Sequence, residues 1–127
     1  MTKKREIYHC PICGNVVEVM SEGGGVLVCC GKPMVELIAG VTDAAKEKHV
    51  PVIEIHNAHV RARVGEVAHP MTEAHLIEWI YFETTLGGTF RFLKAEDKPE
   101  AEIVLAEGEK LVAVYAYCNL HGLWKAN

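Results

Sequence analysis

Cys10-Pro11-Ile12-Cys13 and Val28-Cys29-Cys30-Gly31 decide the fold of the first part of this chain. Two cysteines that flank a tight turn converge on one ion, and four thiolates can close a tetrahedral metal site. The second pair has no spacer, so both sulfurs reach one metal only if the peptide between them twists. We therefore expect a distorted tetrahedral four-cysteine site. Iron is the favoured metal, and a purely structural zinc remains an alternative.

The segment that carries these cysteines is too short for a core of its own. Val16–Met20 and Val26–Val28 read as two short strands, joined by a loop over residues 21–25 with three glycines. Such a hairpin would bring the four sulfurs to one of its ends. We expect the metal to organise this segment, because small modules of this kind depend on their metal for folding.

From about Gly40 the pattern changes to short strands separated by turns, with no long helical period. Strands of this length and spacing favour an antiparallel β-sandwich. One helical turn is expected at Asp43–Lys48. The domain boundary falls within Glu36–Val41, which gives two all-β domains, residues 1–36 and 37–127. The predicted strands of the second domain are Val52–His56, Val60–Val64, Leu76–Glu83, Thr89–Leu93, Glu102–Leu105 and Lys110–Tyr117.

Composition narrows the range of partners and locations. Half of the 127 residues are hydrophobic and the formal net charge is −4. An acidic chain argues against nucleic-acid binding, and an anionic substrate would need a local positive patch. No segment has the apolar length of a membrane helix, so no membrane partner is expected. Cysteines with metal-ligand spacing indicate a reducing compartment, and the cytoplasm is the expected location.

A second metal site of different chemistry is indicated near the end of the chain. Cys118 and His121 are three residues apart, so one turn could present both to a single ion. His49, His69 and His75 lie in loops or before strands, and Pro51 and Pro70 stiffen two of these loops. Four imidazoles and one thiolate exceed the four ligands usual for zinc, and they fit a five-coordinate redox iron with one open position. The other histidines read as ordinary polar side chains: His9, His56 and His59.

Six motifs, taken together, resemble those of desulfoferrodoxin, the two-iron superoxide reductase, over the whole chain. They are Tyr8–Asn15, Val28–Met34, Glu47–Pro51, His69–Met71, His75–Ile80 and Tyr117–Trp124. The resemblance implies a desulforedoxin-like domain with an iron bound by Cys10, Cys13, Cys29 and Cys30. It also implies a seven-stranded immunoglobulin-like domain with a second iron bound by His49, His69, His75 and His121, with Cys118 as the axial ligand.

The same resemblance implies a reaction and its partners. Superoxide would be reduced by one electron to hydrogen peroxide, with electrons from a donor such as rubredoxin, and the protein would be a homodimer. Glu47 and Lys48 match the loop residues beside the open iron position, and Lys48 would supply the local positive charge. Two alternatives remain: an electron carrier or redox sensor with that position occupied, and a structural zinc ribbon joined to a β-sandwich interaction module.

Overall fold

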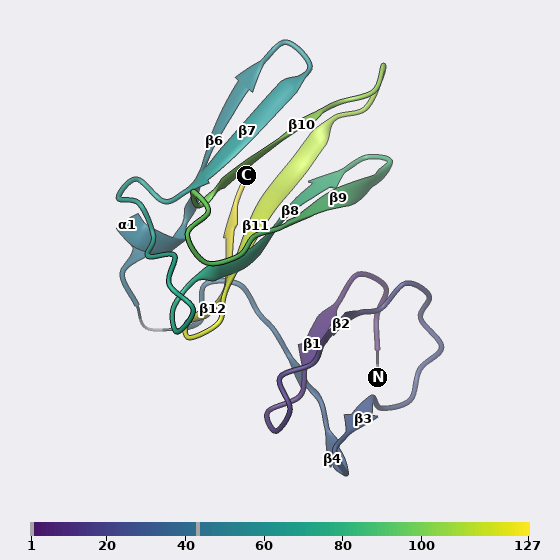
Figure 1. Ribbon diagram of the computed structural model, residues 1–127. Helices are drawn as coiled ribbons and strands as arrows, with labels where there is room; N and C mark the ends of the chain where they lie inside the picture. The colour runs from purple at the N-terminus through teal and green to yellow at the C-terminus, as the bar shows by residue number, and fades with distance from the viewer. Residues whose placement is uncertain (1, 43) are drawn as a thin grey trace. The chain divides into compact units, whose positions relative to one another are not determined.

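Residues 2–42 and 44–127 are described by a computed structural model, shown in Figure 1. The chain divides into two compact units, the first ending at Ile38 and the second beginning at Ala39. Both are built from β-strands, and the described residues include one short helix, α1 (Lys46–His49). Within these residues, no helix has the length and apolar character that crossing a membrane requires.

The first unit holds two small antiparallel sheets. In one, β1 (Ile7–His9) lies between β2 (Val16–Glu18) and β5 (Val35–Glu36). In the other, β3 (Val28–Cys29) pairs with β4 (Lys32–Pro33). Figure 1 labels β1 to β4 in the purple to blue part of the chain.

The predicted hairpin between residues 16–20 and 26–28 is wrong in its pairing. The strand at 16–18 pairs with β1, and β3 turns back at once onto β4. Cys30 and Gly31 form the turn with φ of 54° and 75°. Two successive positive φ values characterise the tight hairpin turn whose twist matches that of paired strands. The turn through Cys30 therefore sets the pairing, and it also provides the twist expected between the adjacent cysteines.

The first unit buries few apolar side chains. Ile7, Cys10 and Val19 are its buried hydrophobic residues among those described. Met20 and Val26, in contrast, are 73% and 68% exposed. Because burial of a few side chains cannot stabilise a unit of this size, its fold depends on the cysteine cluster described below.

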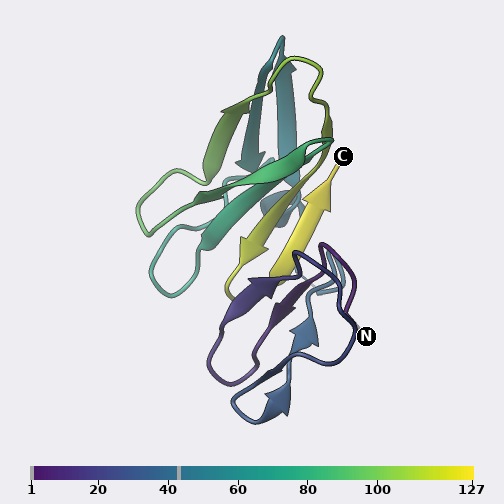
Figure 2. The same cartoon turned by 90° about the vertical axis from the view of Figure 1, so that its right-hand side faces the viewer.

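The second unit is an antiparallel β-sandwich, and Figure 2 views it from the side. Its smaller sheet has the order β10-β7-β6, formed by Glu100–Val104, His59–Val64 and Pro51–His56. Its larger sheet has the order β12-β11-β8-β9. Those strands are, in the same order, Gly122–Ala126, Leu111–Cys118, Ile77–Thr84 and Gly87–Phe92.

Six of these seven strands overlap the strands predicted from sequence, and β12 is the one that the sequence patterns did not indicate. The predicted helical turn is present as α1, shifted toward His49, while Asp43 lies outside the described residues. The seven strands found in the described part of this unit, in a three-plus-four sandwich, confirm the predicted all-β class.

The core lies between the two sheets. In β7 the side chains alternate: Val60, Ala62 and Val64 are buried, while Arg61 and Arg63 face outward near Glu54. This period of two is the pattern of a strand with one face in a core. The buried cluster is completed by residues from the other strands, including one cysteine: Ile77, Ile80, Phe82, Ile103, Val114, Ala116 and Cys118.

Candidate metal centres

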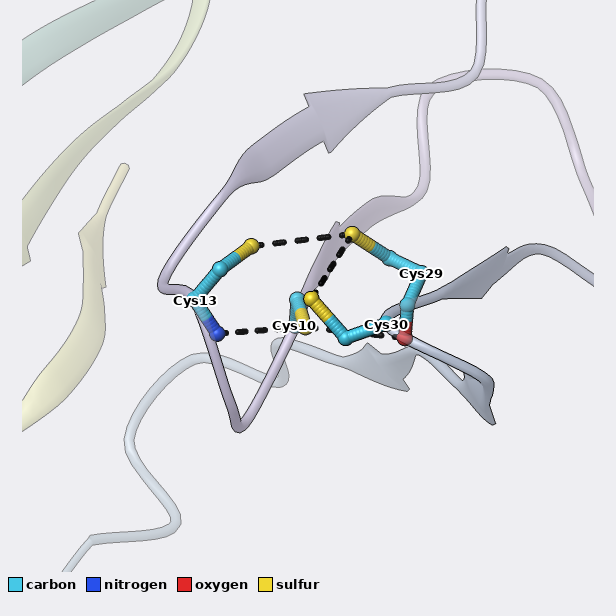
Figure 3. Close-up of side chains that lie close together, drawn as sticks. All are labelled: Cys10, Cys13, Cys29 and Cys30. Atoms are coloured by element: carbon cyan, nitrogen blue, oxygen red, sulfur yellow. Dashed lines mark hydrogen bonds between the residues drawn. The ribbon is translucent and has the colours of Figure 1, made fainter.

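The four N-terminal cysteines converge, as Figure 3 shows. Their sulfurs all lie within 4.8 Å of one another. The Sγ atoms of Cys13 and Cys29 are 3.6 Å apart, and those of Cys29 and Cys30 are 4.0 Å apart. A regular tetrahedron with metal–sulfur bonds of about 2.3 Å has edges of about 3.8 Å. The cluster therefore has the size needed to hold one ion, and its unequal edges match the distortion expected.

Backbone amides stabilise negative charge at the centre of this cluster. The amides of Ile12 and Cys13 each donate to Cys10 Sγ at 3.4 Å. These bonds, with that from Cys13 first, lower the pKa of Cys10 to about 6. The hydrogen bonds that Cys30 shares with the neighbouring sulfurs raise its pKa to about 12. Four thiolates cannot be ionised together at this spacing without a cation, so the donor set fits a metal.

The second cluster is a square of imidazoles. Ring centroids are 4.7 Å apart for His49 and His69, 4.7 Å for His69 and His75, 5.1 Å for His75 and His121, and 4.9 Å for His121 and His49. The diagonal from His49 to His75 is 6.5 Å. Adjacent rings are nearly perpendicular, between 75° and 88°. Such an arrangement is typical of four equatorial ligands.

The ring nitrogens converge at metal-ligand spacing. His49 Nε2 lies 3.1 Å from His121 Nδ1 and 3.2 Å from His69 Nε2. Two nitrogens at right angles on one ion, each about 2.1 Å from it, are about 3.0 Å apart. His75 Nε2 is buried and has no hydrogen-bond partner among the described residues. A metal at the centre of the square would also provide a partner for His75 Nε2.

Backbone carbonyls fix the tautomers of two of these rings. The Nδ1 atoms of His49 and His69 lie 2.7 Å from the carbonyl oxygens of Ala45 and Pro70, respectively. An Nδ1–H that donates to a carbonyl leaves the Nε2 lone pair free to bind metal. Burial above all lowers the pKa of both rings, that of His69 to about 4. Both imidazoles are therefore neutral near pH 7, the protonation state that a metal requires.

Cys118 closes the site from the side of the sandwich core. Its side chain is fully buried, and its Sγ is 3.8 Å from His121 Nδ1. Burial raises the pKa of this thiol, while hydrogen bonds from the amides of Leu120 and His121 oppose that rise. The strand pairing shifts register between Tyr117 and Cys118. Bulges of this kind redirect side chains beside functional sites, and this one lies at the sulfur ligand.

Trp124 supports two of the candidate ligands, although the sequence patterns gave it no role. Its ring stacks on His49 with centroids 4.9 Å apart, and its Nε1–H donates to the carbonyl of His121 at 3.1 Å. Trp124 lies on β12, three residues after His121, and it is buried. Its spacing from His121 is visible in the sequence, but its contact with His49 depends on the tertiary fold.

Glu47 and Lys48 lie on α1, directly before His49, and both are exposed. The carbonyl of Glu47 accepts a hydrogen bond from the amide of Val67, which ties this turn to the loop after β7. Burial is the main cause of the lowered pKa values of His49 and His75, and the charges of His121 and Lys48 lower both further. Lys48 is thus a cation that acts electrostatically on two of the imidazoles.

The remaining histidines are outside both clusters. His56 and His59 pair across the β6–β7 hairpin and are exposed, and His9 is the last residue of β1. Neither metal-ligand group includes any of the three. His69 is not among the four residues of the tighter second group, which are His49, His75, Cys118 and His121, but its Nε2 is 3.2 Å from that of His49.

Comparison with known proteins agrees with this geometry. The desulfoferrodoxin family matches residues 41–127, and the N-terminal domain family of desulfoferrodoxin matches residues 2–37. Desulfoferrodoxins of Syntrophotalea carbinolica and Nitratidesulfovibrio vulgaris are 51% and 52% identical, each covering 99% of this chain and 98% of the relative. The crystal structure of the superoxide reductase from Treponema pallidum aligns with a TM-score of 0.80 at 33% identity, covering 97% of this chain and all of that one.

Proposed function

The chain belongs to the desulfoferrodoxin family, and from this premise we propose that it is a superoxide reductase. In this reaction one superoxide ion takes up one electron and two protons and gives one molecule of hydrogen peroxide. The observation that carries the proposal is the square of four imidazoles with the buried sulfur of Cys118 beside it. Five donors of this kind suit iron and exceed the usual coordination of zinc.

We propose that one iron is held by Cys10, Cys13, Cys29 and Cys30, and a second by His49, His69, His75, His121 and Cys118. Bound iron would supply one-electron redox chemistry at each centre. The imidazoles of His49 and His69 bind metal in their neutral form and give up no proton, whereas Cys118 must lose one. The amides of Leu120 and His121 assist that ionisation by donating to the sulfur.

Lys48 is proposed to attract the substrate. Superoxide is an anion and the chain carries a net charge of −4, so unaided encounter would be opposed by the average field. The exposed ammonium beside His49 and His75 supplies a local charge of the right sign. It can also pass protons to the reduced substrate through water. Glu47, next to it, is proposed to act after electron transfer, when its carboxylate can approach the open side of the site.

We propose residues 1–36 and 37–127 as two domains, a boundary supported by the division into compact units after Ile38. Each turnover at the histidine–cysteine iron needs one electron from outside the chain. A small one-electron carrier such as rubredoxin fits this need, and the four-cysteine centre is a candidate relay. A homodimer and a cytoplasmic location complete the proposal, the latter because both metal sites require reduced thiols.

The stoichiometry of peroxide formation tests this function. The iron-loaded protein is reduced, mixed with superoxide under a continuing supply of an artificial electron donor, and assayed for both products. Reduction yields one hydrogen peroxide for each superoxide and no dioxygen, whereas dismutation yields one for every two. An electron carrier or a zinc protein would not accelerate superoxide loss above the rate with donor alone. The stoichiometry of dismutation, or the absence of any acceleration, would overturn the proposal.

A further inference from the structure

We propose that Asn119 is a positioning residue for His75, which it holds in the imidazole square through the backbone on either side of that ligand. Asn119 follows Cys118 directly and lies in the turn between β11 and β12. The inference rests on the proposed role of His75 as a metal ligand, and it adds a residue that itself contacts no metal.

Three hydrogen bonds link Asn119 to the segment that carries His75. Its Oδ1 accepts from the amide of Leu76 at 3.0 Å, and its Nδ2 donates to the carbonyl of Ala74 at 3.0 Å. Its own amide donates to the carbonyl of Leu76 at 3.2 Å. Strand pairing between β11 and β8 ends at Cys118 and Ile77. The side chain of Asn119 thus continues the connection beyond the ladder, on both sides of His75.

His75 needs this support more than His49 and His69 do. His49 and His69 are oriented by carbonyls that accept from their Nδ1 atoms. No comparable bond to a ring nitrogen of His75 is present within residues 2–42 and 44–127, and its Nε2 is buried without a partner. Its backbone amide is held by the hydroxyl of Thr72 at 3.1 Å. The contact with Thr72 precedes His75, and the bonds to Asn119 lie on both sides of it. The backbone therefore determines where the His75 ring points.

The bond pattern also couples ligands from distant parts of the chain. Cys118 and His121 flank Asn119 closely, so a displacement of the β11–β12 turn is transmitted to His75 through two side-chain bonds. Residues that orient metal ligands from outside typically change metal affinity by about 10–100-fold when removed. We therefore expect Asn119→Ala to accelerate loss of the histidine–cysteine iron by about tenfold. Asn119→Asp keeps the acceptor for Leu76, but it loses the donor to Ala74 and sets a carboxylate oxygen against that carbonyl, so it should also accelerate iron loss.

A double-mutant cycle on iron release separates positioning from a general loss of structure. Wild type, Asn119→Ala, His75→Ala and the double variant are loaded with iron and exposed to a chelator. The decay of the thiolate-to-iron absorption of the histidine–cysteine centre gives the release rate. If Asn119 acts through His75, its substitution changes release by less than twofold once His75 is absent. The same fold-change in both backgrounds would overturn the proposal.

A control variant and a hydrogen-exchange measurement test whether the effect is specific to Asn119. Val104→Ala, which truncates an exposed side chain on β10, should release iron at the wild-type rate. Hydrogen exchange at the Leu76 amide should accelerate in Asn119→Ala, with or without iron, because its acceptor is gone. If Asn119→Ala does not fold, the same cycle is run with Asn119→Asp. A wild-type protein that keeps its iron but does not reduce superoxide would refute the proposed function and leave the positioning role standing.

Discussion

Removal of one sulfur from the four-cysteine cluster should unfold the first unit and leave the second intact. Cys13→Ser replaces a thiolate that lies 3.6 Å from its neighbour with a weaker oxygen ligand. Apart from Cys10, the buried hydrophobic residues among those described in this unit are Ile7 and Val19. At about 1.5–3 kcal/mol each, they contribute about 3–6 kcal/mol to the free energy of unfolding. A structural four-ligand metal contributes about 10–16 kcal/mol, so its loss exceeds what the core supplies.

Hydrogen exchange followed by mass spectrometry measures this effect unit by unit. In wild type the amide of Val19, which donates to the carbonyl of Glu6 at 2.9 Å, should be protected. In Cys13→Ser that protection should vanish, while amides around Ile80 and Val114 in the sandwich core exchange as before. Val26→Ser changes an exposed side chain of the same unit and serves as the control. Continued protection of Val19 in a metal-free Cys13→Ser protein would refute the view that the metal organises this fold.

Three further predictions concern the second unit. Cys118→Ser should abolish both superoxide reduction and the thiolate-to-iron band of the histidine–cysteine centre. The spectrum of the four-cysteine iron should be unchanged, and normal activity would exclude an essential thiolate. Lys48→Ala should slow the bimolecular reaction with superoxide by about tenfold, and less so at high salt, whereas Glu47→Ala should leave that rate unchanged. Pulse radiolysis at two ionic strengths decides this, and an unaltered rate in Lys48→Ala would make that lysine a bystander. Trp124→Phe, which loses the bond to the His121 carbonyl, should lower the free energy of unfolding by about 1 kcal/mol, and Trp124→Ala by about 3–5 kcal/mol, in urea titrations. Wild-type stability in Trp124→Phe would argue against a contribution from the hydrogen bond, and equal losses in the two variants would argue against one from the ring.

The sequence predicts the sandwich strands well because their side chains alternate between core and solvent. Val60–Val64 is the clearest case, with three buried residues separated by two arginines. β12 was missed because Gly122–Ala126 overlaps the ligand motif Tyr117–Trp124, which was interpreted for its ligands and not as a strand. In the first unit the strands span two or three residues, too few for a period to be read. The pairing of β3 with β4 follows instead from the turn at Cys30 and Gly31, which sequence alone left open.

The candidate ligands were predictable from motif and residue type, whereas the ring nitrogen that each histidine turns toward the metal site was not. His121 turns its Nδ1 toward the square, while His49 and His69 present Nε2. Which nitrogen faces inward depends on the carbonyl or sulfur that each ring meets. Those partners lie within four residues of each ring, but the contact depends on a local loop conformation that residue types do not give. The stacking of Trp124 on His49 depends instead on the tertiary fold, because it joins residues that lie far apart in sequence.

The two centres relate to the fold in opposite ways. The first unit buries few apolar side chains, so its fold depends on metal binding by the four sulfurs. In the second unit the core cluster from Val60 to Cys118 is complete without an ion, and carbonyls of Ala45 and Pro70 fix the rings of two ligands. His49 Nε2 lies 3.1–3.2 Å from the facing nitrogens of His121 and His69, and the packed sandwich holds the rings at this spacing. Rings held in this way would impose their geometry on a bound ion, which is how a protein can keep one coordination position open for a substrate.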